Sequence, residues 1–385
     1  MATVNQIYQL VNDSAAEALG AQAISVKNTS TLVSLGDVVL SSADNKDAFY
    51  SALVDRIGRT AIAIRQYRAQ TRSVRKDEME WGLVYQKISF KKVNATTNPT
   101  WTVPSAGQAS PFDVTPKTEA IQKLFSVMAT WSYEDVIPDV QLKSAFLSAE
   151  KMGAFISGIY TNIENSLEQD DEDLANLAVA TMMAGAFSSS NTNQVRYLLD
   201  EYNTANGTNL TAAESLRSSA FLKYASREIA LVTKRMKKMG VHFNDQSVPR
   251  FTPEDKMVVE VLADFATATA SYLEADTYHD ELVKLPRYEE VAYWQATGTA
   301  YSFNDVSKID IQHSSINSGN EVAKSGIIAC VHDYDAASSI IYNRRDNSEY
   351  NKRSEVYVVM MKADKGYAVD TSENCVVFAL TNSDL

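Results

Sequence analysis

Between positions 148 and 184 the sequence repeats apolar residues at steps of three, four or seven, and this periodicity is its strongest structural signal. The stripe consists of Met152, Phe155, Ile156, Ile159, Tyr160, Ile163, Leu167, Leu174, Leu177, Ala178 and Met182. Residues at these steps share one face of an α-helix, and a helix from Ser148 to Ala184 would be about 55 Å long at 1.5 Å per residue. Such a helix exceeds the diameter of a small domain, so we expect it to act as a spine. The acidic run Gln169–Asp173 is a point where it could be interrupted.

The chain before this stripe changes character near position 45. Residues 1–45 are mostly small and polar. One short amphipathic helix is indicated there by the spacing of Ile7, Leu10, Val11 and Leu19. The remainder is expected to be an extended arm without a core of its own. A capped helix is then predicted from Asp44 or Asn45 to Gly58, followed by a strand near Ile62.

Residues 76–134 have the pattern of a long protruding hairpin. Strand composition occurs near Leu83 and up to Lys91, and again over Ala120–Trp131. The connection Asn94–Pro116 is long and rich in Asn, Thr, Ser and Pro, and loops of this length are usually functional. It carries Trp101 and Phe112, which form either a surface for a partner or a patch folded back onto their own domain.

The chain after the stripe predicts mixed helices and strands. A capping box at Thr211–Glu214 precedes one helix, and Thr252–Asp255 is predicted to start another that carries Met257, Val261, Leu262, Phe265 and Tyr272. Short strands are expected at Ile309–Ile311 and Gly326–Val331. The last fifty residues are expected to form an antiparallel meander, with a strand at Val356–Met361, a turn at Ala363–Gly366 and a closing strand at Cys375–Leu380. The predicted class is α+β.

Charge is distributed unevenly along this chain, whose formal net charge is −12. That balance argues against a protein whose main task is to grip nucleic acid, because phosphate binding needs many Lys and Arg. The span 55–92 nevertheless carries ten basic and four acidic residues, whereas the span 164–173 carries six acidic residues and no basic one. Two such blocks predict a contact between adjacent copies of the chain, although two solvated faces fit the same pattern. The candidate contact residues are Arg68, Arg72, Arg75, Lys76, Trp101, Phe112, Glu164, Glu168, Asp170 and Asp171.

Recognisable catalytic chemistry is missing from the sequence. The four histidines lack metal-ligand spacing, and no GxSxG, GxGxxG or phosphate-binding loop occurs. The cluster His332-Asp-Tyr-Asp335 is suited to acid–base work or metal binding. The simpler interpretation, which we favour, is a turn after the strand Gly326–Val331 that Asp333 or Asp335 caps. Cys330 and Cys375 lie in apolar segments and are expected to be reduced core residues. We therefore predict no catalytic residue, metal or cofactor, and no apolar run is long enough to span a membrane.

Three segments, in this order, resemble one protein family. They are Phe49-Tyr-Ser-Ala-Leu-Val-Asp-Arg-Ile-Gly58 leading into Ile62–Arg68, Gln141-Leu-Lys-Ser-Ala-Phe146 leading into Phe155-Ile-Ser-Gly-Ile-Tyr160, and Thr371-Ser-Glu-Asn-Cys-Val-Val-Phe-Ala-Leu380. Through them the chain is similar to the major capsid proteins of tailed phages with the HK-ninety-seven fold, most of all to the phi-twenty-nine type. Residues 191–325 match this family in architecture rather than in residues. Unlike the phi-twenty-nine type, this chain is expected to have no immunoglobulin-like domain after the terminal strand.

The resemblance implies a tailed-phage major capsid fold. It implies an N-terminal arm (1–45), a peripheral domain in three parts (46–75, 135–190 with the spine helix, 336–385), an extended E-loop (76–134) and an axial domain (191–335). It also implies hexamers and pentamers that form an icosahedral head in the virion, with a scaffolding protein and a portal as partners. Packaged double-stranded DNA would be touched only weakly and without specificity, and assembly would take place in the host bacterial cytoplasm.

Two other functions remain open at this level. The first is an encapsulin-like shell around a cargo enzyme, which has the same fold and no genome. Terminase and portal genes beside its gene would indicate a phage, and a gene for a cargo enzyme would indicate the compartment. The second is an enzyme that uses His332 and its neighbouring carboxylates, which would require a pocket with perturbed titrating groups.

Overall fold

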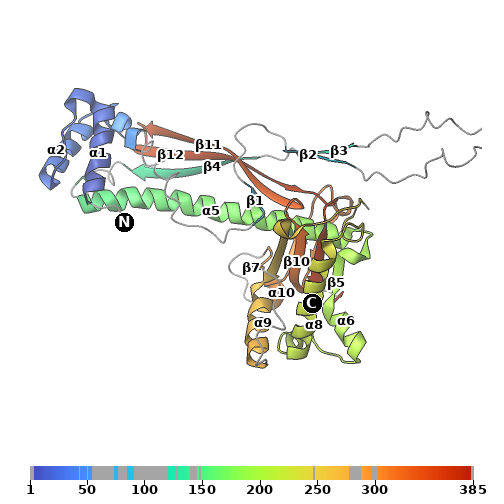
Figure 1. The fold of residues 1–385 in the computed structure, drawn as a ribbon. Coiled ribbons are helices and arrows are strands. Elements are labelled where there is room, and N and C mark those ends of the chain that lie inside the picture. Colours follow the sequence, from blue (N-terminus) through green and yellow to red (C-terminus); the bar gives the residue numbers. More distant parts are fainter. Residues whose placement is uncertain are drawn as a thin grey trace, which may run out of the picture.

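A computed structural model shows one long helix that joins two separate groups of elements (Figure 1). The residues that it describes are 4–42, 44–49, 51–53, 73–76, 85–90, 120–125, 129–138, 145–146, 149–245, 248–276, 288–295 and 302–382. The N-terminal helices lie at one end of the long helix, a lobe of helices and strands lies at the other, and a two-stranded hairpin projects away from both (Figure 1).

The long helix is α5 (Ala149–Ser188), which is continuous over 40 residues and about 60 Å long at 1.5 Å per residue. It confirms the predicted spine helix. The acidic run at 169–173 does not interrupt it, because that run contains neither glycine nor proline. Small buried residues between Ala175 and Ala186 allow a sheet to approach the C-terminal half of the helix closely.

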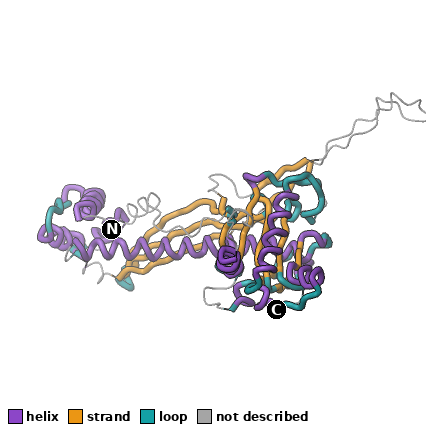
Figure 2. Tube along the Cα trace, turned by 60° about the horizontal axis from the view of Figure 1, so that its bottom comes forward, coloured by secondary structure: helices purple, strands orange, loops and turns teal. Residues whose placement is uncertain are grey.

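A four-stranded sheet lies along the first part of α5 (Figures 1 and 2). Its strands, in spatial order, are β1 (Arg75–Lys76), β11 (Ala337–Asn351), β12 (Val356–Val369) and β4 (Ala129–Pro138). β12 pairs antiparallel with both of its neighbours, and β1 pairs parallel with β11. Tyr357 and Val359 of β12 are buried in one core with Ile163 and Leu167 of α5, so this face of the sheet is covered by the helix.

Two N-terminal helices pack onto the same core, α1 (Val4–Leu19) and α2 (Thr29–Leu40). The first confirms the predicted short helix. The expectation that the rest of residues 1–45 form an extended arm without a core is wrong. Asn28 and Thr31 form a capping box that begins α2, and its residues Leu32, Leu35 and Val39 are buried. The helix predicted from Asp44 is described as far as residue 53, and Gly58 and Ile62 lie outside the described residues.

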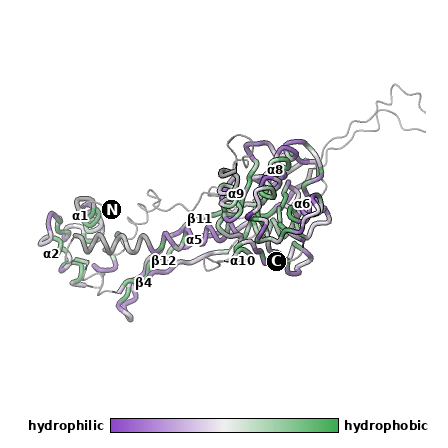
Figure 3. The backbone as a smooth tube through the Cα atoms, turned by 90° about the horizontal axis from the view of Figure 1, so that it is seen from below, coloured by the Kyte–Doolittle hydropathy of each residue, from purple (hydrophilic) through white to green (hydrophobic). Residues whose placement is uncertain are grey.

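The lobe is built around a five-stranded sheet. Its strands, in spatial order, are β5 (Val195–Tyr197), β13 (Cys375–Ala379), β10 (Ile327–Asp333), β6 (Met257–Leu262) and β7 (Glu289–Val291). One face packs against three helices, α6 (Leu198–Asn206), α8 (Ser219–Met236) and α9 (Ala263–Asp276). The other face packs against the C-terminal half of α5. Hydrophobic segments accordingly concentrate inside this lobe (Figure 3).

Smaller elements complete the lobe. They are α7 (Ala212–Ser215), α10 (Phe303–Val306), β8 (Ile309–Ile311) and β9 (Val322–Lys324). The predicted capping box at Thr211 and Glu214 is confirmed, but it caps only the four-residue α7, and Ser218 caps the longer α8 that follows. The predicted strands at Ile309–Ile311 and near Val331 are confirmed as β8 and β10.

Two predicted boundaries are wrong. Residues from Met257 to Leu262 form the buried strand β6 rather than a helix, because three valines favour a strand and β10 and β7 pair with it on both sides. The helix starts only at Ala263. The expected turn at Ala363–Gly366 lies inside β12, where this segment pairs with β11 and β4. The closing strand is confirmed as β13.

The predicted hairpin is confirmed at its base. β2 (Tyr85–Phe90) and β3 (Ala120–Phe125) pair antiparallel, with Tyr85 opposite Phe125. Of the predicted return segment, residues 120–125 belong to β3, which pairs with β2, and residues 129–131 belong to β4, which pairs with β12. Residues 126–128 lie outside the described residues. The connection from 91 to 119 lies outside the described residues.

Candidate functional site

The structure describes six of the ten residues predicted to make contacts between subunits. They are Arg75 and Lys76 on β1, and Glu164, Glu168, Asp170 and Asp171 on α5. The other four, Arg68, Arg72, Trp101 and Phe112, lie outside the described residues. β1 and the acidic segment of α5 meet where the four-stranded sheet approaches the lobe (Figure 1).

Arg75 binds Glu168 within the same chain. Its Nη1 lies 2.8 Å from Glu168 Oε1, and its Nη2 donates a hydrogen bond of 3.3 Å to the backbone oxygen of Glu168. Both side chains are partly buried, so solvent screens their attraction less than it would on an open surface. The basic and acidic blocks therefore meet within one subunit through this pair, and their contact between subunits stays a prediction.

Lys76 binds the turn between β10 and β11. Its Nζ donates hydrogen bonds to the backbone oxygen of Tyr334 at 2.8 Å and to Asp335 Oδ1 at 3.4 Å. Burial lowers the pKa of Lys76 to about 8, even though the Asp335 carboxylate acts in the opposite direction. Asp335, from the His332 cluster, thus fixes the chain at the root of the hairpin.

Asp171 is buried, which sequence reasoning missed. Its carboxylate pairs with the Nζ of Lys365 from β12, and the same Nζ lies 3.4 Å from the backbone oxygen of Leu167. The alternative that the acidic run is a solvated face is therefore wrong for Asp171. The sequence did not indicate this buried pair, because Lys365 lies in the segment predicted to be a turn.

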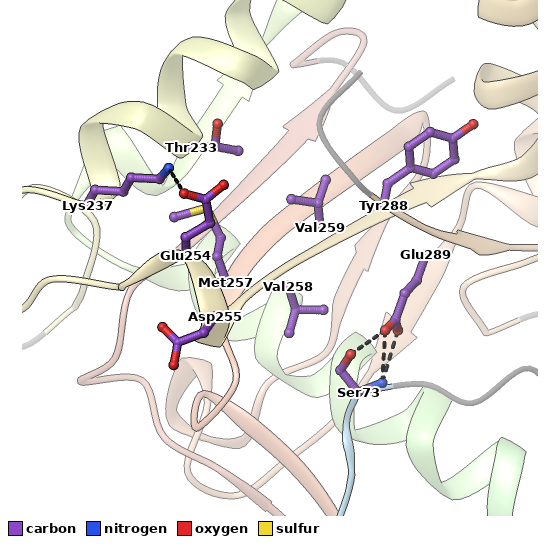
Figure 4. Close-up of a pocket in the computed structure, with 10 residues that line it drawn as sticks. All are labelled: Ser73, Thr233, Lys237, Glu254, Asp255, Met257, Val258, Val259, Tyr288 and Glu289. Atoms are coloured by element: carbon purple, nitrogen blue, oxygen red, sulfur yellow. Dashed lines mark hydrogen bonds and ion pairs between the residues drawn. The ribbon is translucent and has the colours of Figure 1, made fainter. Parts of the chain in front are cut away.

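Four consecutive residues, from Ser73 to Lys76, attach β1 to four different parts of the fold. Glu289 on β7 accepts hydrogen bonds from the backbone N–H of Ser73, at 3.0 Å, and from its hydroxyl (Figure 4). Val74 is buried, and its backbone oxygen accepts a 2.9 Å hydrogen bond from the N–H of Ser339. Arg75 binds α5 and Lys76 binds the β10–β11 turn, so this segment connects the four-stranded sheet to the lobe.

A groove of about 880 Å³ lies beside this junction, between α8, β6 and the start of β7 (Figure 4). Val258 and Val259 of β6 line it between two polar contacts. One contact is the bond between Ser73 and Glu289, and the other is a 2.6 Å ion pair between Lys237 and Glu254. Its described lining residues include no cysteine or histidine, and the only hydroxyl with a carboxylate partner, that of Ser73, serves to fix the chain.

His332 is wholly buried in the middle strand of the lobe. Its Nδ1 lies 2.9 Å from the backbone oxygen of Asp333, and its Nε2 lies 3.9 Å from Glu260 Oε1. Burial acts to lower the pKa of His332, but the Glu260 carboxylate outweighs it, so the pKa is raised. An imidazole enclosed in this way is a packing residue rather than an acid–base catalyst open to a substrate.

The two cysteines confirm the prediction of buried, reduced residues. Cys330 and Cys375 are both free, and their Sγ atoms lie 3.9 Å apart on neighbouring strands. In the part of the chain that the structure describes, no three His, Cys, Asp or Glu side chains are grouped so that they could hold a metal ion. Among the described helices, none combines the length and apolarity needed to cross a membrane.

The fold is similar to those in several solved phage structures. One comes from the head fiber and inner core protein gp22 structure of native bacteriophage P68, with 7% identity, a TM-score of 0.54 and coverage of 83% of this chain and 87% of that one. The capsid of Staphylococcus phage Andhra follows with 9% identity, a TM-score of 0.48 and coverage of 80% and 82%. The capsid of cyanophage P-SCSP1u has 11% identity, a TM-score of 0.48 and coverage of 83% and 91%. At such identities the likeness to the P68 chain shows the fold alone.

Sequence comparison identifies the family. No curated protein matches the chain. The family model described as Phi29-like phage major capsid protein matches residues 11–379, which is nearly the whole chain. This is a family of structural proteins and not of enzymes, and its members form the homo-oligomeric capsid of the virion. The match confirms the resemblance drawn from the three sequence segments. The chain therefore belongs to the Phi29-like phage major capsid proteins, as a shell subunit of a phage head.

Proposed function

We propose that this subunit assembles as hexamers and pentamers into an icosahedral head that encloses the double-stranded DNA of a tailed phage. The observation that carries the proposal is the β2–β3 hairpin, which projects from the body and pairs with neither of the two larger sheets (Figure 1). An isolated two-stranded hairpin is marginally stable in water, so we expect such an extension to be stabilised by packing on another chain. The family match favours this function over an encapsulin-like compartment.

The parts of the subunit take the roles that the family implies. We assign residues 1–45 to the N-terminal arm, 76–134 to the E-loop and 191–335 to the axial domain. Residues 46–75, 135–190 and 336–385 form the peripheral domain. The arm in this assignment consists of the two helices α1 and α2.

The hairpin loop would lie over the spine helix of a neighbouring subunit, where the basic block 55–92 meets the acidic patch 164–173. Arg75 and Glu168 already pair within one chain, and Asp171 is engaged by Lys365. The acidic candidates for the contact with an incoming chain are Glu164, Glu168, Asp170 and Asp171, and Arg68 and Arg72 are candidates on the basic side. A Glu164→Lys variant that assembles like the parent would count against this contact.

A scaffolding protein and a portal are the expected protein partners, and assembly would occur in the host bacterial cytoplasm. Packaged DNA would make only weak, non-specific contact, in keeping with the net charge of −12. Electron microscopy of the purified chain, alone and with the products of neighbouring genes, tests the proposal. We expect closed shells with sixfold and fivefold capsomers, and small oligomers under every condition would overturn it.

A further inference from the structure

Two lysines face each other across the β2–β3 hairpin. Lys87 is directly opposite Lys123 in the strand register, so both side chains lie on the same face of the ladder. Like charges in directly opposed positions destabilise a strand pair. An isolated hairpin of two strands is only marginally stable, so an anion must lie close by to offset the repulsion between the two lysines.

Asp370 provides that anion from the loop between β12 and β13. Its Oδ2 lies 2.9 Å from the Nζ of Lys87, and its Oδ1 lies 2.6 Å from the Nζ of Lys123. A second carboxylate comes from Glu373, whose Oε1 lies 2.7 Å from the Nζ of Lys87 and 3.5 Å from the Nη2 of Arg250. One carboxylate therefore bridges both strands of the hairpin.

The loop holds this carboxylate in place. The Oδ1 of Asp370 accepts hydrogen bonds from the backbone N–H of Ser372 at 3.0 Å and from its hydroxyl at 2.6 Å. Burial acts to raise the pKa of Asp370, but the two lysines outweigh it and hold the pKa well below its usual range. The pKa of Lys87 is raised, because the carboxylates of Asp370 and Glu373 outweigh the effect of burial, which acts to lower it. Asp370 and Lys87 are therefore both charged at neutral pH.

The other face of the hairpin carries two exposed aliphatic side chains beside two glutamines. Successive residues of a strand point to opposite faces, so Ile88 and Leu124 lie on the side away from the two lysines, with Gln122 and Gln86 directly opposite them in the register. The exposed fractions of Ile88 and Leu124 are 56% and 61%, which is unusual for large aliphatic side chains that lie close together. By fixing the lysine face to the body, Asp370 turns the face that carries Ile88 and Leu124 outward.

We propose that Asp370 is a positioning residue for assembly, which latches both strands of the hairpin to the body and presents Ile88 and Leu124 to a second copy of this chain. A second copy is the natural occupant, because the capsid is built from many copies of this subunit.

The latch is tested on the unassembled full-length chain by hydrogen exchange and mass spectrometry. The Asp370→Asn variant and the Lys87→Gln/Lys123→Gln variant should both accelerate exchange in 85–90 and 120–125, by roughly tenfold to a hundredfold for loss of charged hydrogen bonds. Combining all three substitutions should accelerate exchange in the hairpin little further than either variant does alone. Exchange in α5 and β10 should stay unchanged, which confirms that the variants fold. Unchanged hairpin exchange in the double lysine variant would overturn the latch and leave Asp370 with a role in its own loop only.

The docking face is tested by assembly, and this part rests on the proposed function. The Ile88→Thr/Leu124→Thr variant keeps strand-compatible residues on β2 and β3, so it should leave hairpin exchange unchanged and reduce shell yield by about tenfold or more. A matched control is Glu254→Gln, which removes the exposed ion pair with Lys237 and touches none of the contacts of Lys87 and Lys123, so it should change neither measurement. Normal shells from the double threonine variant would overturn the docking face. A parent chain that forms no shells would instead contradict the proposed function, while leaving the exchange test of the latch intact.

Discussion

Lys365 of β12 and Asp171 of α5 form an ion pair in the interior of the protein, where their side chains are only 1% and 4% exposed. Lys365 Nζ also donates a 3.0 Å hydrogen bond to the hydroxyl oxygen of Tyr133 on β4, and that hydroxyl donates in turn to Asp170. Adjacent acidic residues on one turn of α5 thus hold two strands of the sheet. The network sets the register between the spine helix and the sheet.

Replacing Lys365 by Met should lower the free energy of unfolding by about 3–5 kcal/mol, because Asp171 would be left buried without its partner. Urea denaturation followed by circular dichroism measures this loss. The double variant Lys365→Met/Asp171→Leu should recover much of it, since no charge is then buried alone.

A matched control comes from a more exposed pair, Arg345 and Asp364, at 2.7 Å. Arg345→Gln should cost less than about 1 kcal/mol, because solvent screens the pair. If Lys365→Met cost no more than Arg345→Gln, the buried pair would not be what fixes the helix on the sheet.

Two glycines on helices should respond to alanine with opposite signs. A Cβ on Gly36 of α2 would lie 2.8 Å from the Cβ of Phe146, so Gly36→Ala should destabilise the protein by about 1–3 kcal/mol through overpacking. Among the described residues, none outside the neighbouring backbone of α5 has an atom within 4 Å of a Cβ on Gly158, so Gly158→Ala should stabilise by up to about 1 kcal/mol through helix propensity. Thermal melts of the two variants measure the difference. Stabilisation by both would show that α2 does not pack against Phe146 as described.

Lys76 should make stability depend on alkaline pH. Its pKa in the folded protein is about 8, below the unfolded value of about 10.4, so the unfolded chain binds a proton that the folded chain has released. The contribution of this group to stability therefore rises between about pH 8 and pH 10.5. The free energy of unfolding of the parent minus that of Lys76→Met should increase across this window. A constant difference would mean that Lys76 stays charged through it.

Asp370 should make stability depend on pH in the acidic range, and in the same sense as Lys76, because its contribution also rises as the pH rises. Its pKa in the folded protein lies below the unfolded value of about 3.9, so the unfolded chain takes up the proton first as the pH falls. Its contribution is complete above about pH 5 and is lost as the pH drops below 4. The groups that face it are Lys87, Lys123, Glu373 and Ser372. The difference between the parent and Asp370→Asn should shrink in acid, and an unchanged difference at pH 3 would contradict the prediction.

Local patterns predict those parts of the protein that depend on near neighbours in sequence. The apolar stripe from Met152 to Met182 predicts α5, because side chains three and four residues apart share a helix face in any tertiary setting. Alternation and turn composition likewise predict the base of the β2–β3 hairpin and the closing strand β13. The order of these segments along the chain was enough to indicate the family.

Other parts were decided by contacts between distant residues. Helix-start signals at Thr252 and turn signals near Gly366 amount to tenths of a kcal/mol up to about 1 kcal/mol each, and pairing with strands on both sides outweighs them. Contacts between distant residues also decided which charged side chains pair. The sequence by itself determined that a basic and an acidic block exist, and that a spine helix and a hairpin carry them. Only the tertiary structure decided that Asp171 is buried beneath Lys365 and that Asp370 bridges Lys87 and Lys123, because those partners are 194, 283 and 247 positions apart and no local preference brings them together.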